Sequence, residues 1–165
     1  SMKEIDHYAT RRQALADKYL APPGSAPASV AADNPSLLTA GVDHLALICS
    51  DVEATIEFYT QVLQMRLTRI VQNRDDATST HIFLDMGGGN LLAFFDFPQH
   101  GPAKTVRGVG SMHHVALKAS QTQYGAVLQA LESGGIEHSI HGDKERGSVY
   151  MRDPDNIMVE VTTGY

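Results

Sequence analysis

The chain has 165 residues, enough for one domain or for two small modules that share a core. Its net charge of −6 and its isoelectric point near 5.7 argue against a nucleic-acid-binding protein, which needs a concentrated basic surface. No apolar run approaches the roughly eighteen residues of a membrane span, and the first residues lack the apolar stretch of a signal peptide. Cys49 is the only cysteine, so no internal disulfide is possible, and its apolar neighbours predict a buried, unreactive thiol. Composition therefore predicts a soluble cytoplasmic protein that acts on a small molecule.

Residues 1–36 are expected to form an N-terminal arm, separate from a folded domain over residues 37–165. An apolar stripe predicts a short helix over residues 3–20. Prolines and alanines then dominate residues 21–27, a composition that cannot continue a helix and indicates a linker. The arm carries no pattern typical of chemistry, so the functional site is expected in the domain.

The domain repeats itself along the chain. Residues 42–47, Val-Asp-His-Leu-Ala-Leu, match residues 112–117, Met-His-His-Val-Ala-Leu, and both segments have the pattern of a strand. Ser-x-x-Glu follows the first segment at Ser50, and Ser-x-x-Gln follows the second at Ser120. Each is interpreted as a capping box, in which the two side chains satisfy free backbone N–H groups where a helix begins.

Each predicted helix is followed by three strand candidates. They are residues 67–72, 80–85 and 91–97 in the first copy, and 137–141, 148–152 and 157–162 in the second. Two β-α-β-β-β modules, over residues 40–98 and 110–163, therefore make up one domain of the α+β class. We expect the two modules to form a curved mixed β-sheet around a metal site.

Two histidines and one glutamate are the candidate metal ligands. His44 and His114 occupy equivalent places on the first strand of each module, so pseudo-twofold packing would bring the two imidazoles together. Glu160 is the only charge in the apolar residues 157–161, where a carboxylate is costly unless it is paired or binds a metal. The equivalent residue of the first module is Ala93, so one carboxylate is expected. Two histidines and one carboxylate suit Fe(II) and O2 chemistry, with Mn or Zn also accepted; structural histidines and an edge-strand glutamate are the alternatives.

The doubled module, the two histidines and the segment Tyr-Met-Arg-Asp-Pro-Asp-Asn at residues 150–156 resemble the vicinal oxygen chelate superfamily. The resemblance covers residues 40 to 163. That superfamily includes glyoxalase I, fosfomycin-resistance enzymes, bleomycin-binding proteins, methylmalonyl-CoA epimerase and type I extradiol dioxygenases. It implies that one divalent metal is held by His44, His114 and Glu160 beside a chelating substrate.

Within the superfamily, the ligand set is similar to that of extradiol dioxygenases and fosfomycin-resistance enzymes. Glyoxalase I and the epimerase have an acid or amide near the place of Ala93, which disfavours them. The extradiol motif runs from a His through an apolar residue, a Tyr and a Pro to the Glu, and His141, Tyr150, Pro154 and Glu160 match it. The resemblance is therefore closest, by motif, to the type I extradiol dioxygenases.

Three residues depart from the extradiol pattern. Ser139 stands two residues before His141, and Asn156 replaces a Gly or Pro, although Asn can adopt the left-handed conformation of a glycine. Asn90 stands where extradiol enzymes have an acid/base His, and an amide can hydrogen-bond O2 or substrate but cannot shuttle a proton. The third departure bears on ring cleavage itself.

The leading hypothesis is a non-haem dioxygenase with Fe(II) as the favoured metal and a small catecholic or other vicinal-oxygen substrate. In it, His141 and Tyr150 hydrogen-bond the substrate oxygens and assist proton transfer, while Asn90 faces the O2 position. A metal-dependent lyase, transferase or isomerase is one alternative, and a non-catalytic binder like the bleomycin-resistance proteins is another. No nucleic acid or membrane is expected as a partner, and the sequence leaves a homodimer open. His81 and His100 are weaker candidates for the site.

Overall fold

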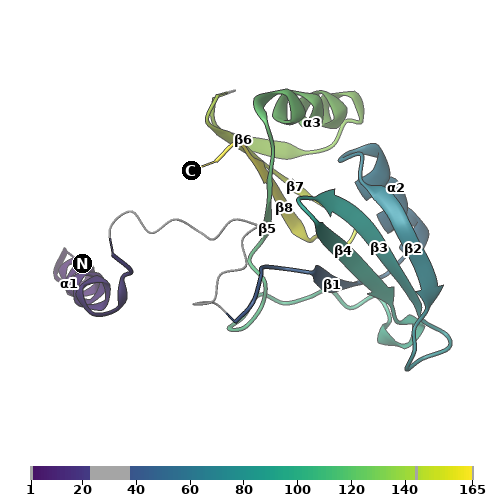
Figure 1. Cartoon of the computed structure of the whole chain (residues 1–165), viewed down its shortest axis with the longest axis horizontal. Helices are drawn as coiled ribbons and strands as arrows, with labels where there is room; N and C mark the ends of the chain where they lie inside the picture. The colour runs from purple at the N-terminus through teal and green to yellow at the C-terminus, as the bar shows by residue number, and fades with distance from the viewer. Residues whose placement is uncertain (1, 23–37, 144, 165) are drawn as a thin grey trace. The chain divides into compact units, whose positions relative to one another are not determined.

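A computed structural model of the chain describes residues 2–22, 38–143 and 145–164 (Figure 1). The chain divides into two compact units, residues 1–41 and 42–165. The first unit contains helix α1 (Met2–Tyr19), close to the predicted residues 3–20, and none of its residues is buried. Most of the predicted linker lies outside the described residues. Among the described helices, none combines the length and apolar character that crossing a membrane requires.

The second unit contains the two predicted β-α-β-β-β modules (Figure 1). The elements of the first module are β1 (His44–Cys49), α2 (Val52–Gln61), β2 (Arg66–Gln72), β3 (Thr80–Gly87) and β4 (Asn90–Asp96). A short 3-10 turn, η1 (Pro98–His100), follows them. The elements of the second module are β5 (Val115–Lys118), α3 (Gln121–Ser133), β6 (His138–Gly142), β7 (Gly147–Arg152) and β8 (Met158–Thr162).

Each module forms its own four-stranded mixed sheet. The strand orders are β1-β4-β3-β2 and β5-β8-β7-β6, with one parallel pair in each, β1 with β4 and β5 with β8. The α+β class and the tandem modules are therefore confirmed. The expected mixed β-structure consists of two four-stranded sheets, one from each module, which are not closed into a barrel.

The two helices begin differently, although both were expected to begin with a capping box. Ser120 and Gln123 form the full capping box of α3. In α2 the prediction is wrong, because Asp51 is the N-cap and its carboxylate accepts a hydrogen bond from Ala54 N at 3.1 Å. The side chain of Ser50 instead donates to Asp155, which lies 105 residues later in the chain. The serine hydroxyl thus hydrogen-bonds a distant carboxylate in place of a backbone N–H group at the start of the helix.

The core of each module lies between its helix and one face of its sheet. Strand period puts Leu45, Leu47 and Cys49 of β1 on the core side, and α2 packs on β2, β3 and β4. The largest fully buried apolar side chains are Tyr59, Phe94, Ile82, Leu84 and Leu92 in the first module, and Tyr124, Leu131, Met151, Val149 and Val159 in the second. Burying one such aliphatic or aromatic side chain contributes about 1.5–3 kcal/mol. The opposite faces of the two sheets remain available for a site.

Two aspartates of the turn between β7 and β8 bind the first module. Tyr59 Oη donates a buried hydrogen bond to Asp153 Oδ2 at 2.9 Å, and Ser50 N donates to Asp155 Oδ2 at 3.0 Å. Within the turn, Asp153 also accepts from the backbone of Asp155 and Ile157. Burial nevertheless raises the pKa of Asp153 above its ordinary value. These bonds fix the start of β8, the strand that carries Glu160.

Asn156 adopts the left-handed conformation that the sequence predicts for it, with φ of 66°. Gly87, Gly88 and Gly89 all have positive φ and form the tight turn between β3 and β4. Neither turn is followed by a helix.

Candidate metal and substrate site

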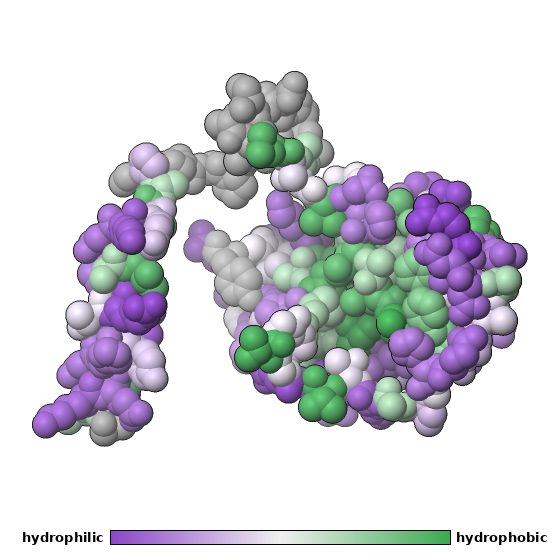
Figure 2. Space-filling view, turned by 90° about the horizontal axis from the view of Figure 1, so that it is seen from below, coloured by the Kyte–Doolittle hydropathy of each residue, from purple (hydrophilic) through white to green (hydrophobic). Residues whose placement is uncertain are grey.

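Each sheet has one face that does not pack on its helix, here called the open face. In β1 the exposed residues His44, Ala46 and Ile48 alternate with the core-facing residues. Strand register carries this face across the first sheet, since Ala46 is paired with Ala93, and Ala93 with Phe83. Figure 2 shows apolar side chains gathered on one side of the second unit, with hydrophilic side chains around them.

Register also relates the two modules residue by residue. Ala116 is paired with Glu160, and Glu160 with Tyr150, in the same pattern as Ala46, Ala93 and Phe83. Glu160 and Ala93 are thus equivalent, as the repeat predicts. Of these two equivalent positions, the one in the second sheet has a carboxylate and the one in the first sheet has a methyl group.

His114 and Glu160 lie together on the second sheet. His114 Nε2 is 2.9 Å from Glu160 Oε2. The Glu160 side chain is fully buried, whereas His114 is 30% exposed, so one partner of the pair still reaches the surface. A buried carboxylate is costly unless it is paired, and His114 is a partner that can donate a proton to it.

Tyr150 and His141 extend this group on the same open face. The ring of Tyr150 is 5.9 Å from the ring of His114 and 5.3 Å from the ring of His141, which is perpendicular to it. Register pairs Tyr150 with Glu160 across β7 and β8, and His141 with Ser148 across β6 and β7. Four of the six residues predicted for the site therefore form one continuous group.

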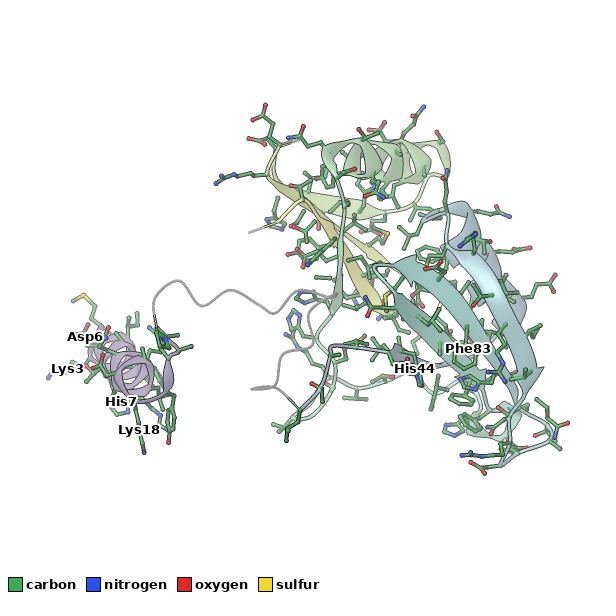
Figure 3. The ribbon with its side chains drawn as sticks, viewed as in Figure 1. Lys3, Asp6, His7, Lys18, His44 and Phe83 are labelled. Carbon is green, nitrogen blue, oxygen red and sulfur yellow. The ribbon has the colours of Figure 1, made fainter. Side chains whose placement is uncertain are left out.

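His44 belongs to a different group. Its side chain is 43% exposed, its Nδ1 lies 2.7 Å from Asp43 Oδ2, and its ring is 5.8 Å from that of Phe83 (Figure 3). Over the described residues of one chain, no three His, Cys, Asp or Glu side chains lie close enough to hold a metal ion. The structure therefore brings His114 and Glu160 together but does not bring His44 to them.

Asn90 is not brought to the group either. It is the first residue of β4, one residue before the open-face residue Leu91, so strand period places it on the core side. Its amide nitrogen is 3.4 Å from the carbonyl oxygen of Gly88 in the preceding turn. The structure thus gives Asn90 a local contact and no contact with the candidate ligands.

The residues that precede the two histidines were missed as site residues. Asp43 contacts Nδ1 of His44, and Nδ1 of His113 lies 2.7 Å from Nδ1 of His114. When His114 Nε2 acts as a ligand, its proton resides on Nδ1 and is donated to His113. Asp43 and His113 stand at the same place in the repeat, so the alignment of the two strands contained this signal.

Three further residues complete the sequence candidates. Cys49 is buried, as predicted, and burial raises the pKa of its thiol to about 11, which disfavours the reactive thiolate. His81 stacks on Phe95 with ring centroids 3.6 Å apart, and burial, followed by the charges of neighbouring groups, lowers the pKa of its imidazole. His100 is exposed in η1.

The donors of the second sheet fit a divalent metal. Two ligands about 2.1 Å from one ion in octahedral coordination would be separated by about 3 Å. The 2.9 Å between His114 Nε2 and Glu160 Oε2 agrees with that spacing. One neutral imidazole and one carboxylate also form a donor set that Fe, Mn and Zn accept. A third donor has to come from outside this group.

Comparison with known proteins places these features in a family context. The sequence model of the Glyoxalase/Bleomycin resistance protein/Dioxygenase superfamily matches residues 41–161. The chain is 26% identical over 128 residues to "Uncharacterized protein YwkD" of Bacillus subtilis, which covers 76% of this chain and 98% of YwkD. It is 27% identical over 86 residues to "Putative ring-cleaving dioxygenase MhqA" of the same organism. That match covers 50% of this chain and 27% of MhqA, so the chain spans only about a quarter of that relative.

Solved structures show the same fold at low identity. A glyoxylase/bleomycin resistance protein/dioxygenase domain from Frankia sp. EAN1pec superposes with a TM-score of 0.66 at 18% identity, over 76% of this chain and 98% of that one. A mutant of the fosfomycin resistance protein FosX from Listeria monocytogenes, complexed with Mn(II) and 1S,2S-dihydroxypropylphosphonic acid, gives 0.60 at 18% identity, over 78% and 95%.

Proposed function

The chain belongs to the glyoxalase/bleomycin resistance protein/dioxygenase superfamily, and from this premise we propose that it is a metal-dependent dioxygenase of the extradiol type. The observation that carries the proposal is the 2.9 Å contact between Nε2 of the partly exposed His114 and Oε2 of the buried Glu160, with Tyr150 and His141 beside it. Fe(II) is the favoured metal, because two histidines and one carboxylate with open positions suit it. The substrate is a small molecule with two adjacent oxygens.

His44 completes the ligand set from a second copy of the chain. The positions of the two histidines on their strands, and the positions of these strands at sheet edges, support this assignment. His44 lies at the start of β1 and His114 just before β5, and both strands are edges of their sheets. In a symmetric dimer, each copy can supply His44 to the His114–Glu160 pair of the other, which yields two equivalent sites. A site shared in this way accounts for the separation of the ligands within one chain.

The chain's own residues then handle substrate and protons. When bound, the metal supplies Lewis acidity and neighbouring positions for the substrate oxygens. Tyr150 donates a hydrogen bond from its hydroxyl to a substrate oxygen. His141, whose ring meets Tyr150 at 5.3 Å, accepts a proton from a substrate hydroxyl and returns it as the product forms. Both atoms of O2 end in the ring-opened product, so no separate reductant is required.

A mixing experiment tests the shared site. His44→Ala and Glu160→Ala should each lose metal, since each removes a ligand from both sites of the dimer. When the two variants are unfolded together and refolded, mixed dimers contain one site with all three ligands. Metal content should therefore recover toward half a site per chain in the mixed dimers. If metal content does not recover in the mixed dimers, the site is not shared between two chains in this way. The control is refolding of each variant alone.

Oxygen uptake tests the reaction. The iron-loaded wild type should consume O2 in step with ring opening on a panel of catechols, including bulky ones. Uptake that never exceeds the metal-free background, despite a full complement of iron, would refute the dioxygenase.

A second candidate is a redox-neutral enzyme that chelates its substrate on Mn(II). Asn90 favours it, because an amide stands where extradiol enzymes have an acid/base His and cannot shuttle a proton. Turnover under anaerobic conditions with Mn(II), and none that depends on O2, would select this candidate.

A further inference from the structure

The open face of the first sheet forms an open pocket beside His44, with a volume of about 410 Å³. Its floor is aromatic. His81 stacks on Phe95 at 3.6 Å and meets Phe83 at 4.2 Å between ring centroids. A volume of this size, lined by aromatic rings and a few polar groups, is typical of sites for small organic ligands. The pocket therefore suits a planar, apolar ring.

One charge in this pocket is not neutralised. Arg69 lies with Cζ 5.7 Å from the centroid of the Phe83 ring, paired with it across β2 and β3. Arg74, which also lines the pocket, is 3.6 Å from Asp75. Among the residues that the structure describes, no carboxylate forms an ion pair with Arg69. The pocket thus presents a guanidinium whose fork of N–H donors remains available to an anion.

Phe83 links this cation to the metal-ligand side of the pocket. Its ring centroid is 5.8 Å from that of His44 (Figure 3) and 5.7 Å from Cζ of Arg69. Ala93, which is paired with Phe83 in the neighbouring strand, is fully buried, so the accessible part of this face lies over Phe83, His81 and Phe95. A small aromatic ring in this pocket therefore has both His44 and Arg69 within reach of its substituents.

We infer that this pocket is a subsite for an aromatic substrate that carries a negatively charged group, such as a carboxylate, with Arg69 as the residue that selects for the charge. The inference rests on the proposed function, since it names the substrate class for the site that His44 helps to form. Phe83 packs against the substrate ring, whose chelating oxygens face the side of the pocket that His44 lines and whose anionic group contacts Arg69. Arg69 and Phe83 are specificity-determining residues and not metal ligands.

Benzoate and benzamide provide a matched pair of probes, because they share ring and shape and differ in charge. The full chain, treated with chelator, is titrated with each probe and followed by ¹H–¹⁵N NMR. Benzoate should bind about tenfold more tightly than benzamide, the effect of one charge-assisted contact. Arg69→Gln should reduce this preference to less than about twofold. Phe83→Leu should weaken both probes and retain the preference.

Arg66→Gln is the control, because Arg66 lies on the same strand but outside the pocket, where it is paired with Asp85 at 3.1 Å. This variant should keep the wild-type preference. The inference is overturned if the wild type does not prefer benzoate, or if Arg69→Gln leaves the preference intact. Metal titration of the same samples tests the proposed function separately. A chain that prefers benzoate but binds no metal refutes the proposed function and leaves the anionic subsite standing.

Discussion

Replacing Glu160 by Gln should have opposite effects on the metal-free and the metal-bound protein. The carboxylate is fully buried and lies 2.9 Å from one partly exposed imidazole. Removing such a charge from water costs several kcal/mol, which pairing with other groups offsets only in part. Gln has nearly the same shape and no charge. We therefore expect metal-free Glu160→Gln to be more stable than the wild type by about 1–3 kcal/mol.

Metal should reverse this order. A concentration of Mn(II) equal to a hundred times the dissociation constant stabilises a protein by about 2.7 kcal/mol. The variant lacks the anionic ligand, so we expect its affinity to fall by about a hundredfold or more, and the same concentration then adds only about 0.4 kcal/mol. The stability curves of the two proteins against metal concentration should cross.

Urea denaturation with chelator and with increasing Mn(II) measures both effects. Glu137→Gln is the matched control, because Glu137 is exposed and should change neither quantity. The reasoning is refuted if metal-free Glu160→Gln is less stable than the wild type by more than about 1 kcal/mol while Mn(II) stabilises both proteins equally. Glu160 would then be a structural residue of β8.

Three further predictions concern the turn before β8 and the residues beside the candidate ligands His114 and Glu160. Tyr59→Phe leaves the buried carboxylate of Asp153 without one donor and should cost about 1–3 kcal/mol in urea denaturation, whereas the exposed Tyr19→Phe should cost almost nothing. Burial raises the pKa of Asp153, so the native state holds this proton more tightly, and the group's contribution to stability is lost as pH rises from about 3.8 through the raised value. The difference in the free energy of unfolding between the wild type and Asp153→Asn should therefore shift against the wild type as pH rises through that range, and it should stay constant at higher pH. His141→Ala and Tyr150→Phe should retain metal but slow turnover of a catechol by roughly a hundredfold to ten-thousandfold; loss of metal would instead make them structural supports of the pair.

Most of the fold could be predicted from the sequence because the same pattern of strands and helix occurs in both modules, so each copy supports the assignment of the other. Strand period places His114, Glu160, Tyr150 and His141 on one face, and the structure has them within contact of one another. The same argument makes Ala93 and Glu160 equivalent in the repeat, and the strand register agrees, since Ala93 is paired with Ala46 and Glu160 with Ala116. Local periodicity is sufficient for these residues.

Features that depend on distant partners could not be predicted in this way. Ser50 has the local pattern of a helix cap, yet Asp155 binds it from the other module, and Asp51 caps the helix instead. The position of His44 away from Glu160 likewise depends on how two sheets are arranged, which no repeat within the chain specifies. The contact of Arg69 with Phe83 arises from a strand pairing that spans a bulge.

The difference between Ala93 and Glu160 has a consequence for how such a protein can evolve. Duplication produced two equivalent strands, but only the later one carries the acid, so the earlier module is free of that constraint. Substitutions on β2 and β3 can then alter which ring or charge is recognised without disturbing the His114–Glu160 pair. A division of labour of this kind allows a lineage to acquire new substrates while its reactive centre stays constant. Laboratory selection for altered substrate range should accordingly accumulate changes in the first module.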